Sequence, residues 1–361
     1  MPTCSASSRP MMRRNKLLII LFLSGVVLLF NSFANTSDYW AISKEDVKLK
    51  VPKHFPKPSY DFSANKLSPS VFVLGRKLFY DPILSRDSST SCASCHMRIA
   101  AFAHIDHKLS HGINGLIGTR NVPALQNLIF KSYYMWDGGV NNLEMQPINP
   151  ITNPAEMDSK LQDVLMKLKR DPTYDSLFRV AFSDSVITSK YLFKALAQFT
   201  GLMISSDSRY DRYIDHKDTL SAQELRGLAD FRKRCSSCHK EPLFTTNALT
   251  SNGIAPDTAL KDIGYGKVTA NADDNYKFVV PSLRNVAMTY PYMHDGRYKS
   301  LEQVLDYYSA GIYSTPSADP LLKNTTGMND DEKKDIIAFL KTLTDKTFLY
   351  DRRFADPNTS H

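Results

Sequence analysis

Apolar residues recur every three to four positions along much of this 361-residue chain, which is the period of a helix with one buried face. The stretch 69–80 shows this period after Ser68, a residue type that caps helix starts, and the stretches 157–170 and 189–203 repeat it. Strict alternation of apolar and polar residues, the mark of a half-buried strand, is scarce. The pattern predicts a mainly α protein with few or no strands.

Further helix starts and breaks organise the rest of the chain. Ser221 begins a capping box that opens one helix, and Asn329 opens a last helix that is expected to run through Leu343. Residues 205–213 are expected to form a linker. Residues 35–67 contain three prolines among charged residues, and an extended lead-in is expected there.

The pentapeptide Cys-x-x-Cys-His occurs twice, at residues 92–96 and 235–239. It is the attachment site of c-type haem, because two thiols one helical turn apart can each add to a vinyl group of one porphyrin, and the following histidine can ligate the iron. A zinc ribbon spaces its cysteine pairs roughly 15–20 residues apart, and neither zinc nor disulfides explain the two histidines. Two haem c groups are expected, with thioether bonds from Cys92, Cys95, Cys235 and Cys238 and iron ligation by His96 and His239.

The N-terminus has the organisation of a secretory signal peptide. Arg13, Arg14 and Lys16 precede the uncharged apolar run 17–30, and small residues follow at 32–34. The run is shorter than the roughly 20 residues of a membrane-spanning helix. We therefore expect export to the periplasm with cleavage, and an uncleaved membrane anchor is the alternative.

Charge says little about partners. The formal net charge is +8, but the first 34 residues hold four basic residues and no acidic one, so the rest carries 41 basic and 37 acidic residues, a net charge of +4. Two haems would add four propionates and bring the protein near neutrality. No basic run with interleaved aromatic residues is present, and no nucleic-acid partner is expected.

One haem motif falls in each half of the mature chain, which is long enough for two domains with cores of their own. Two cytochrome c-like haem domains are predicted. The expected divisions are a signal peptide at 1–34, the lead-in at 35–67, an N-terminal haem domain at 68–205, a C-terminal haem domain at 206–345 and a tail at 346–361.

Five blocks between and around the haem motifs carry a resemblance to a known family. With both motifs, they resemble the bacterial di-haem cytochrome c peroxidases, a family that includes the methylamine-utilisation protein MauG. The resemblance covers residues 68–345. The blocks are LGRKLFYDP at 74–82, RNVPAL at 120–125, MWDG at 135–138, PSLRN at 281–285 and PYMHDG at 291–296.

The resemblance implies an N-terminal haem that reduces hydrogen peroxide and a C-terminal haem that transfers electrons. It makes Gln146 and Glu156 the pair on the distal face of the N-terminal haem, where a carboxylate can move the proton of bound peroxide while an amide positions the ligand. Trp136 matches a tryptophan between the haems. Asn121, Thr289 and Pro291 match positions that hold a calcium ion, a hard cation that prefers oxygen ligands.

Two departures from the peroxidase pattern distinguish this chain. Counting fourteen residues from His294 to the expected axial methionine of the C-terminal haem reaches Tyr308, and MauG-like members use a tyrosine there. The other candidate ligands are Met288, Met293 and Met328. The position of the histidine that closes the N-terminal haem in conventional members is Ile113, with His111 two residues away, so an open N-terminal haem is expected.

Three functions compete. The first is a periplasmic cytochrome c peroxidase, an oxidoreductase that takes electrons from a small electron-donor protein. The second is a MauG-like oxidase that uses peroxide to oxidise Tyr or Trp residues of a partner protein. The third is a non-catalytic electron carrier, which Gln146, Glu156 and an open coordination site disfavour. The peroxidase is the preferred hypothesis.

Overall fold

The computed structural model describes Met1 and residues 42–183, 186–311 and 315–358, and residues 43–361 form one compact unit. The predicted signal peptide lies outside the described residues. Within the described part, no helix combines the length and apolar character needed to cross a membrane.

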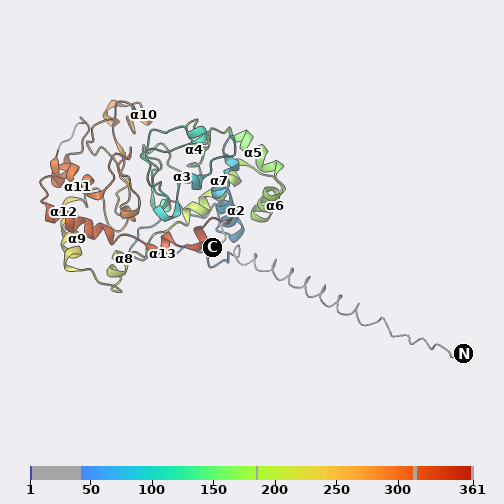
Figure 1. Cartoon of the computed structure of the whole chain (residues 1–361), viewed down its shortest axis with the longest axis horizontal. Helices are drawn as coiled ribbons and strands as arrows, with labels where there is room; N and C mark the ends of the chain where they lie inside the picture. Colours follow the sequence, from blue (N-terminus) through green and yellow to red (C-terminus); the bar gives the residue numbers. More distant parts are fainter. Residues whose placement is uncertain (2–41, 184–185, 312–314, 359–361) are drawn as a thin grey trace. The chain divides into compact units, whose positions relative to one another are not determined.

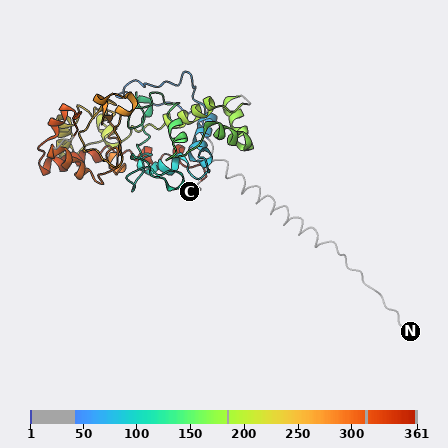
Figure 2. The ribbon, with the colours of Figure 1, turned by 90° about the horizontal axis from the view of Figure 1, so that it is seen from above.

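Short helices joined by long loops make up this unit, as the mainly α prediction expected. In Figures 1 and 2, α2 and α5–α7 gather at one end and α9, α11 and α12 at the other. The helices of the N-terminal half are α2 (Pro69–Tyr80), α3 (Cys92–Cys95), α4 (Ile148–Thr152), α5 (Leu161–Arg170), α6 (Pro172–Phe182) and α7 (Ser189–Gly201). Those of the C-terminal half are α8 (Arg209–Ile214), α9 (Ala222–Arg234), α10 (Gly266–Thr269), α11 (Leu301–Ala310), α12 (Asp330–Lys341) and α13 (Lys346–Leu349).

The described strands form one antiparallel pair, β1 (Leu249–Thr250) and β2 (Phe278–Val279), in which Leu249 faces Val279. They lie in the C-terminal half of the chain. The prediction of few or no strands is thereby confirmed.

The helix starts predicted at Ser221 and Asn329 are confirmed by their caps, whereas Ser68 precedes α2 without a side-chain cap hydrogen bond. Helix α2 has the predicted bounds, and Ser221 forms the predicted capping box at the start of α9. Asn329 caps α12 through the backbone N–H groups of residues 331 and 332. The helix predicted at 157–170 begins only at Leu161, because Asp158 has a φ of 45°, which is left-handed.

In both halves a glycine allows two helices to pack closely where they cross. In the N-terminal half α2 crosses α7, and a Cβ on Gly75 would overlap the carbonyl of Ala195. In the C-terminal half α9 crosses α12, and a Cβ on Gly227 would overlap the carbonyl of Asp335. Each crossing therefore requires a glycine, and each glycine-bearing helix comes before a haem motif.

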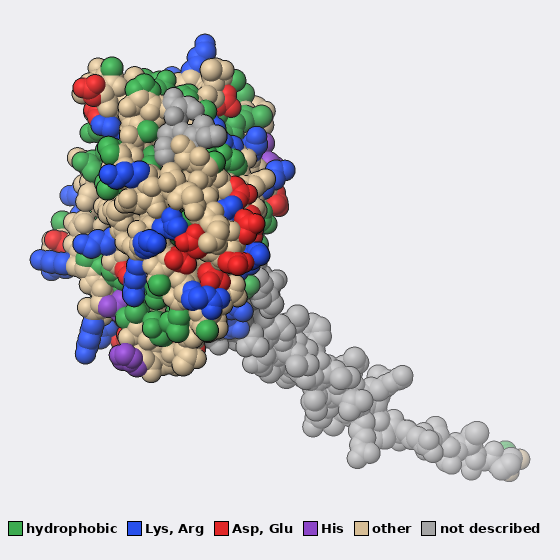
Figure 3. Space-filling view, turned by 90° about the vertical axis from the view of Figure 1, so that its left-hand side faces the viewer, with side chains coloured by type: hydrophobic (Ala, Val, Ile, Leu, Met, Phe, Trp, Pro, Cys, Tyr) green, Lys and Arg blue, Asp and Glu red, His purple; other side chains and the backbone are tan. Residues whose placement is uncertain are grey.

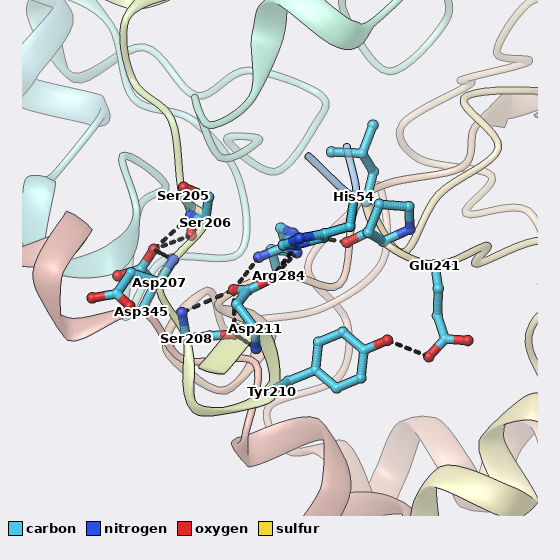
Figure 4. A network of polar contacts seen from close by, with 12 residues as sticks. His54, Ser205, Ser206, Asp207, Ser208, Tyr210, Asp211, Glu241, Arg284 and Asp345 are labelled. Carbon is cyan, nitrogen blue, oxygen red and sulfur yellow. Dashed lines mark hydrogen bonds and ion pairs between the residues drawn. The ribbon is translucent and has the colours of Figure 1, made fainter. Parts of the chain in front are cut away.

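The predicted linker is held by a buried polar network, and part of it is helical as α8 (Figure 4). The fully buried Arg284 donates two hydrogen bonds to the carboxylate of Asp211, at 2.7 and 2.8 Å. The carboxylate of Asp345 accepts hydrogen bonds from the backbone N–H groups of Ser206 and Asp207. Since buried charges are costly without partners, this network fixes the path of the chain between the haem motifs.

The lead-in and the tail both pack on the N-terminal half. The N–H groups of Ser59 and Tyr60 donate to the carbonyl of Ile129. Phe354 of the tail is buried against Phe72 and Phe199, with ring centroids 6.2 and 6.1 Å apart. Both segments thus contribute to the core, and the proposed domain boundaries stay a prediction.

Candidate functional site

Two cavities accompany the two Cys-x-x-Cys-His motifs. The N-terminal cavity, of about 660 Å³, is lined by Cys95 and His96, and the C-terminal cavity, of about 240 Å³, by Cys235, Cys238 and His239. The N-terminal cavity lies within the roughly 300–1,000 Å³ that cavities for small molecules and cofactors commonly enclose, and the C-terminal cavity lies below that range. Each motif therefore borders a cavity, and the larger one belongs to the N-terminal motif.

The first motif is presented by a single helical turn. Ser91 and Ser94 form a capping box around α3, so that Cys92 and Cys95 lie at the two ends of one turn. Burial raises the pKa of the Cys92 thiol to about 12 and that of the Cys95 thiol as well. The four described cysteines are free thiols in pairs of this kind, which fits thioether attachment of haem.

Both motif histidines are oriented in the same way. The Nδ1 atom of His96 lies 2.6 Å from the carbonyl oxygen of Phe102, and that of His239 lies 3.1 Å from the carbonyl oxygen of Phe244. Burial lowers the pKa of His96 to about 4 and lowers that of His239 too. A neutral imidazole whose Nδ1 is bound to a carbonyl leaves Nε2 free to ligate iron.

Gln146 and Glu156 line the N-terminal cavity together with His96. The side-chain amide of Asn153 donates to Oε1 of Glu156 at 2.7 Å. Burial raises the pKa of Glu156, and this outweighs the lowering effects of Asn153 and Arg120. A carboxyl group with a raised pKa holds a proton more readily than an ordinary one, which suits a group that both accepts and returns a proton.

Arg120 is a site residue whose role the sequence did not indicate. It donates to Asp137 at 2.6 Å and to Asp262 at 2.6 and 2.7 Å, and Asp262 comes from the C-terminal half of the chain. Both halves therefore build the wall of the N-terminal cavity. The Arg-Asn pair at 120–121 was visible as a motif, but its acidic partner lies too far along the chain for a local pattern to find.

Trp136 lines both cavities, and its indole N–H donates to the carbonyl oxygen of Asn121 at 2.8 Å. The backbone N–H of Asn121 in turn donates to the carbonyl of His294 at 2.7 Å. The indole is thus fixed in the wall between the two motifs.

Three predicted axial candidates line the C-terminal cavity: Tyr308, Met293 and Met328. The Sδ atom of Met293 lies 3.4 Å from the side-chain amide of Asn252, and Met328 is buried. The neighbouring Tyr307 does not line the cavity, and its hydroxyl donates to the carbonyl of Asn252.

Asn121, Thr289 and Pro291, the predicted calcium ligands, all line this same cavity. The amide nitrogen of Asn121 donates to the carbonyl of Lys108 at 3.1 Å, which leaves its side-chain oxygen as an available acceptor. Among the described residues no group of three His, Cys, Asp or Glu side chains could hold a metal ion. Calcium would depend on amide, hydroxyl and backbone oxygens.

His111 does not line the N-terminal cavity. Its ring packs against that of His107, with centroids 4.7 Å apart, and its carbonyl oxygen lies 3.3 Å from Sγ of Cys95. This arrangement agrees with an open N-terminal haem, which stays a prediction.

Two cavities, each bordered by a Cys-x-x-Cys-His motif with an oriented histidine, define a c-type cytochrome architecture with two haem sites. The family profile described as di-haem cytochrome c peroxidase matches residues 69–219. The chain is 36% identical over 311 residues to the methylamine utilization protein MauG of Methylorubrum extorquens, covering 82% of this chain and 83% of that protein. It is 31% identical over 276 residues to the cytochrome c551 peroxidase of Nitrosomonas europaea, covering 75% and 79%.

A solved structure of similar fold is that of a MauG-like protein associated with microbial copper homeostasis. It is 31% identical, with a TM-score of 0.76, and the match covers 86% of this chain and 99% of that one. The chain belongs to the di-haem cytochrome c peroxidase family, which includes MauG, as its motifs indicated.

Proposed function

We propose that this protein is a periplasmic peroxidase that reduces hydrogen peroxide to water at the N-terminal haem, with electrons supplied through the C-terminal haem by a small donor protein. The observation that carries the proposal is the common cavity of His96, Gln146 and Glu156. Haem bound there supplies the redox chemistry. A plain electron carrier would have no use for a half-buried carboxyl group and an amide in the cavity that would hold this haem.

Glu156 is the proton carrier in this proposal. Its carboxylate accepts a proton from the inner oxygen of hydrogen peroxide and returns it to the outer oxygen, which departs as water. Asn153 holds Oε1 in place for both transfers. Gln146, whose amide nitrogen lies 3.8 Å from Sδ of Met135, positions the peroxide. Two electrons and two further protons complete the reduction to two water molecules.

Trp136 and Tyr308 serve electron transfer. An indole in the wall of both cavities shortens the path between the haems, and its hydrogen bond to Asn121 keeps it there. A tyrosine ligand from α11 would favour the oxidised state of the C-terminal haem. Asn121, Thr289 and Pro291 are proposed to bind calcium beside this path.

The electron donor is proposed to dock on the end formed by the C-terminal half. Figure 3 shows acidic and basic side chains interspersed on that face. Several are paired, for example Lys333 with Asp306 at 2.8 Å. Docking through local contacts, with a weak dependence on salt, is therefore expected.

A MauG-like oxidation of Tyr or Trp residues in a partner protein is the second candidate. Tyr308 in the C-terminal cavity favours it, and a relative named MauG is among the similar proteins. In that case the two electrons come from the partner's aromatic side chains.

The test is to replace Glu156 by Gln and to follow stopped-flow optical changes after hydrogen peroxide is added to the oxidised holoprotein. The rate should fall by about 10²–10⁴-fold, because the amide cannot accept the proton. Glu144→Gln is the control, since that carboxyl group binds the hydroxyl of Tyr60 and does not line the cavity. An unchanged rate in Glu156→Gln would refute the assigned role.

The same sample separates the two functions. Steady consumption of peroxide with a reduced small cytochrome supports the peroxidase. Peroxide-dependent crosslinks or hydroxylation in a partner protein, seen by mass spectrometry without added reductant, support the MauG-like oxidase.

A further inference from the structure

Lys131 is a sheltered cation that faces both haem cavities. It directly follows the short helical turn at Leu128–Phe130, and its side chain lines the N-terminal and the C-terminal cavity. Among the described residues, no oxygen accepts a hydrogen bond from its ammonium group and no carboxylate pairs with it. Burial lowers the pKa of Lys131 to about 8. Lys131 is half-buried, and a charge sheltered in this way is costly unless an anion accompanies it.

The other basic residues of the C-terminal cavity do not compete for that anion. Besides Lys131, the described lining contains Arg234, which forms an ion pair with Glu332 at 2.6 Å. Arg234 also adjoins Cys235, so it lies at the edge of the cavity where the porphyrin is attached. Away from Cys235, the basic residue of the described lining is therefore Lys131.

The N-terminal cavity leads to the same conclusion. Arg120 is already paired with two aspartates, and Lys261 and Lys267 are exposed at the rim. Lys131 is the sheltered basic residue of the described lining that has no acidic partner.

The haem itself provides the missing anions. Its two propionates lie on the edge of the porphyrin opposite the vinyl groups, and the vinyl groups are the points of cysteine attachment. The wall common to both cavities includes Lys131, Trp136 and Val122 and contains no cysteine. Lys131 therefore lies where propionate edges are expected when thioether bonds hold the far edge of each haem.

We infer that the ammonium group of Lys131 forms an ion pair with haem propionate at the wall between the two sites and raises the midpoint potential of the haem that it contacts. The inference rests on the proposed occupation of both cavities by haem c and not on which reaction the protein catalyses. A cation beside a propionate favours the ferrous state, which carries one positive charge less than the ferric state. Lys131 is thus a positioning residue that adjusts electron transfer beside Trp136.

The test is spectroelectrochemical titration of the holoprotein, combined with resonance Raman measurement of the propionate bending bands. Lys131→Met should lower the equilibrium constant for reduction of at least one haem about tenfold. For a one-electron couple this lowers the midpoint potential by about 59 mV. The propionate bands should shift as well. Lys131→Arg should stay close to the wild type, because it keeps the charge. Lys267→Met is the matched control, a lysine at the exposed rim of the same cavity.

Each outcome decides the question. Potentials and propionate bands unchanged in Lys131→Met, with both haems attached, would overturn the inference. Loss of haem in Lys131→Met but not in Lys131→Arg would support it, because Lys131→Arg keeps the positive charge and Lys131→Met removes it. Equal changes in Lys131→Met and Lys131→Arg would overturn it, because the shape of the side chain would then be the cause. Altered potentials with normal peroxide kinetics in all variants would leave the proposed function standing.

Discussion

The two halves of the molecule use the same scaffold on the cysteine side of their cavities and different residues on the other side. In each half a glycine allows two helices to cross closely, and a Cys-x-x-Cys-His turn follows with its histidine bound to a backbone carbonyl. Gln146 and Glu156 line the cavity of His96, whereas Tyr308 and Met328 line the cavity of His239. In the proposed function the shared scaffold holds a haem in each half, and the differing residues of the two cavities give the two haems different roles.

The two cavities also differ in size and in the polarity of their lining. The N-terminal cavity is larger and holds a carboxyl group with a raised pKa. The C-terminal cavity is smaller, and the core residues Phe231, Leu340 and Ile336 form part of its lining. In the proposed function, proton transfer takes place in the first cavity and electron transfer passes through the second.

The largest expected effect on stability comes from the network that joins the halves. Arg284→Met should destabilise the protein by about 3–5 kcal/mol, because the buried carboxylate of Asp211 loses its partner. Chemical denaturation of the holoprotein measures this. Arg226→Met is the control, since the side chain of Arg226 is mostly exposed in its pair with Asp335 and its loss should destabilise the protein much less. Equal losses in both variants would contradict the role given to the network.

Replacing the glycine at each of the two helix crossings tests whether the scaffolds of the two halves are equivalent. Gly75→Ala and Gly227→Ala should each cost roughly 1–3 kcal/mol, because the added methyl group meets a backbone carbonyl that cannot move aside. Thermal unfolding measures both. Gly201→Ala should cost less, since its new methyl group would meet only side-chain atoms of Phe62, Ile129 and Leu143. A loss in only one of the two crossings would show that the halves are not equivalent.

Replacing Tyr308 by Met should affect only the C-terminal haem. Methionine favours ferrous iron more than tyrosinate does, so the midpoint potential of that haem should rise by on the order of 100 mV, within the range of about 0.8 V that axial ligands cover. Low-temperature EPR with redox titration resolves the two haems. A change confined to the N-terminal haem would exclude Tyr308 as the axial ligand.

The smallest expected effect concerns the pH dependence of peroxide cleavage. The rate of peroxide cleavage should fall on the acid side, because the proton acceptor is lost as the pH falls through the pKa of Glu156. Since this pKa is raised, that acid limb should lie at a higher pH than an ordinary carboxyl group would give. Asn153 lowers this pKa through its hydrogen bond to Oε1, so Asn153→Ala should move the limb to higher pH. Asn149→Ala is the control, an exposed residue of the same cavity. A limb that moves to lower pH in Asn153→Ala would contradict this assignment.

Much of the fold was predictable because its determinants are local. The caps at Ser221 and Asn329 and the apolar face of 69–80 depend on residues a few positions apart. Helix α6 was not predicted, although Asp171 caps it through the N–H groups of Thr173 and Tyr174. The late start of α5 was missed too, because the left-handed conformation of Asp158 leaves little trace in a hydrophobic pattern.

The sequence by itself determined the mainly helical class, the two haem attachment turns and the family, since these depend on residue types at short fixed spacings. Only the tertiary structure decided which distant residues share a cavity: Asp262 with Arg120, Glu156 with His96, and Lys131 with both haem sites. The physical reason is the separation along the chain of the residues that interact. Caps and attachment turns form within a few residues, whereas burial and charge pairing depend on segments brought together by the packing of the whole chain.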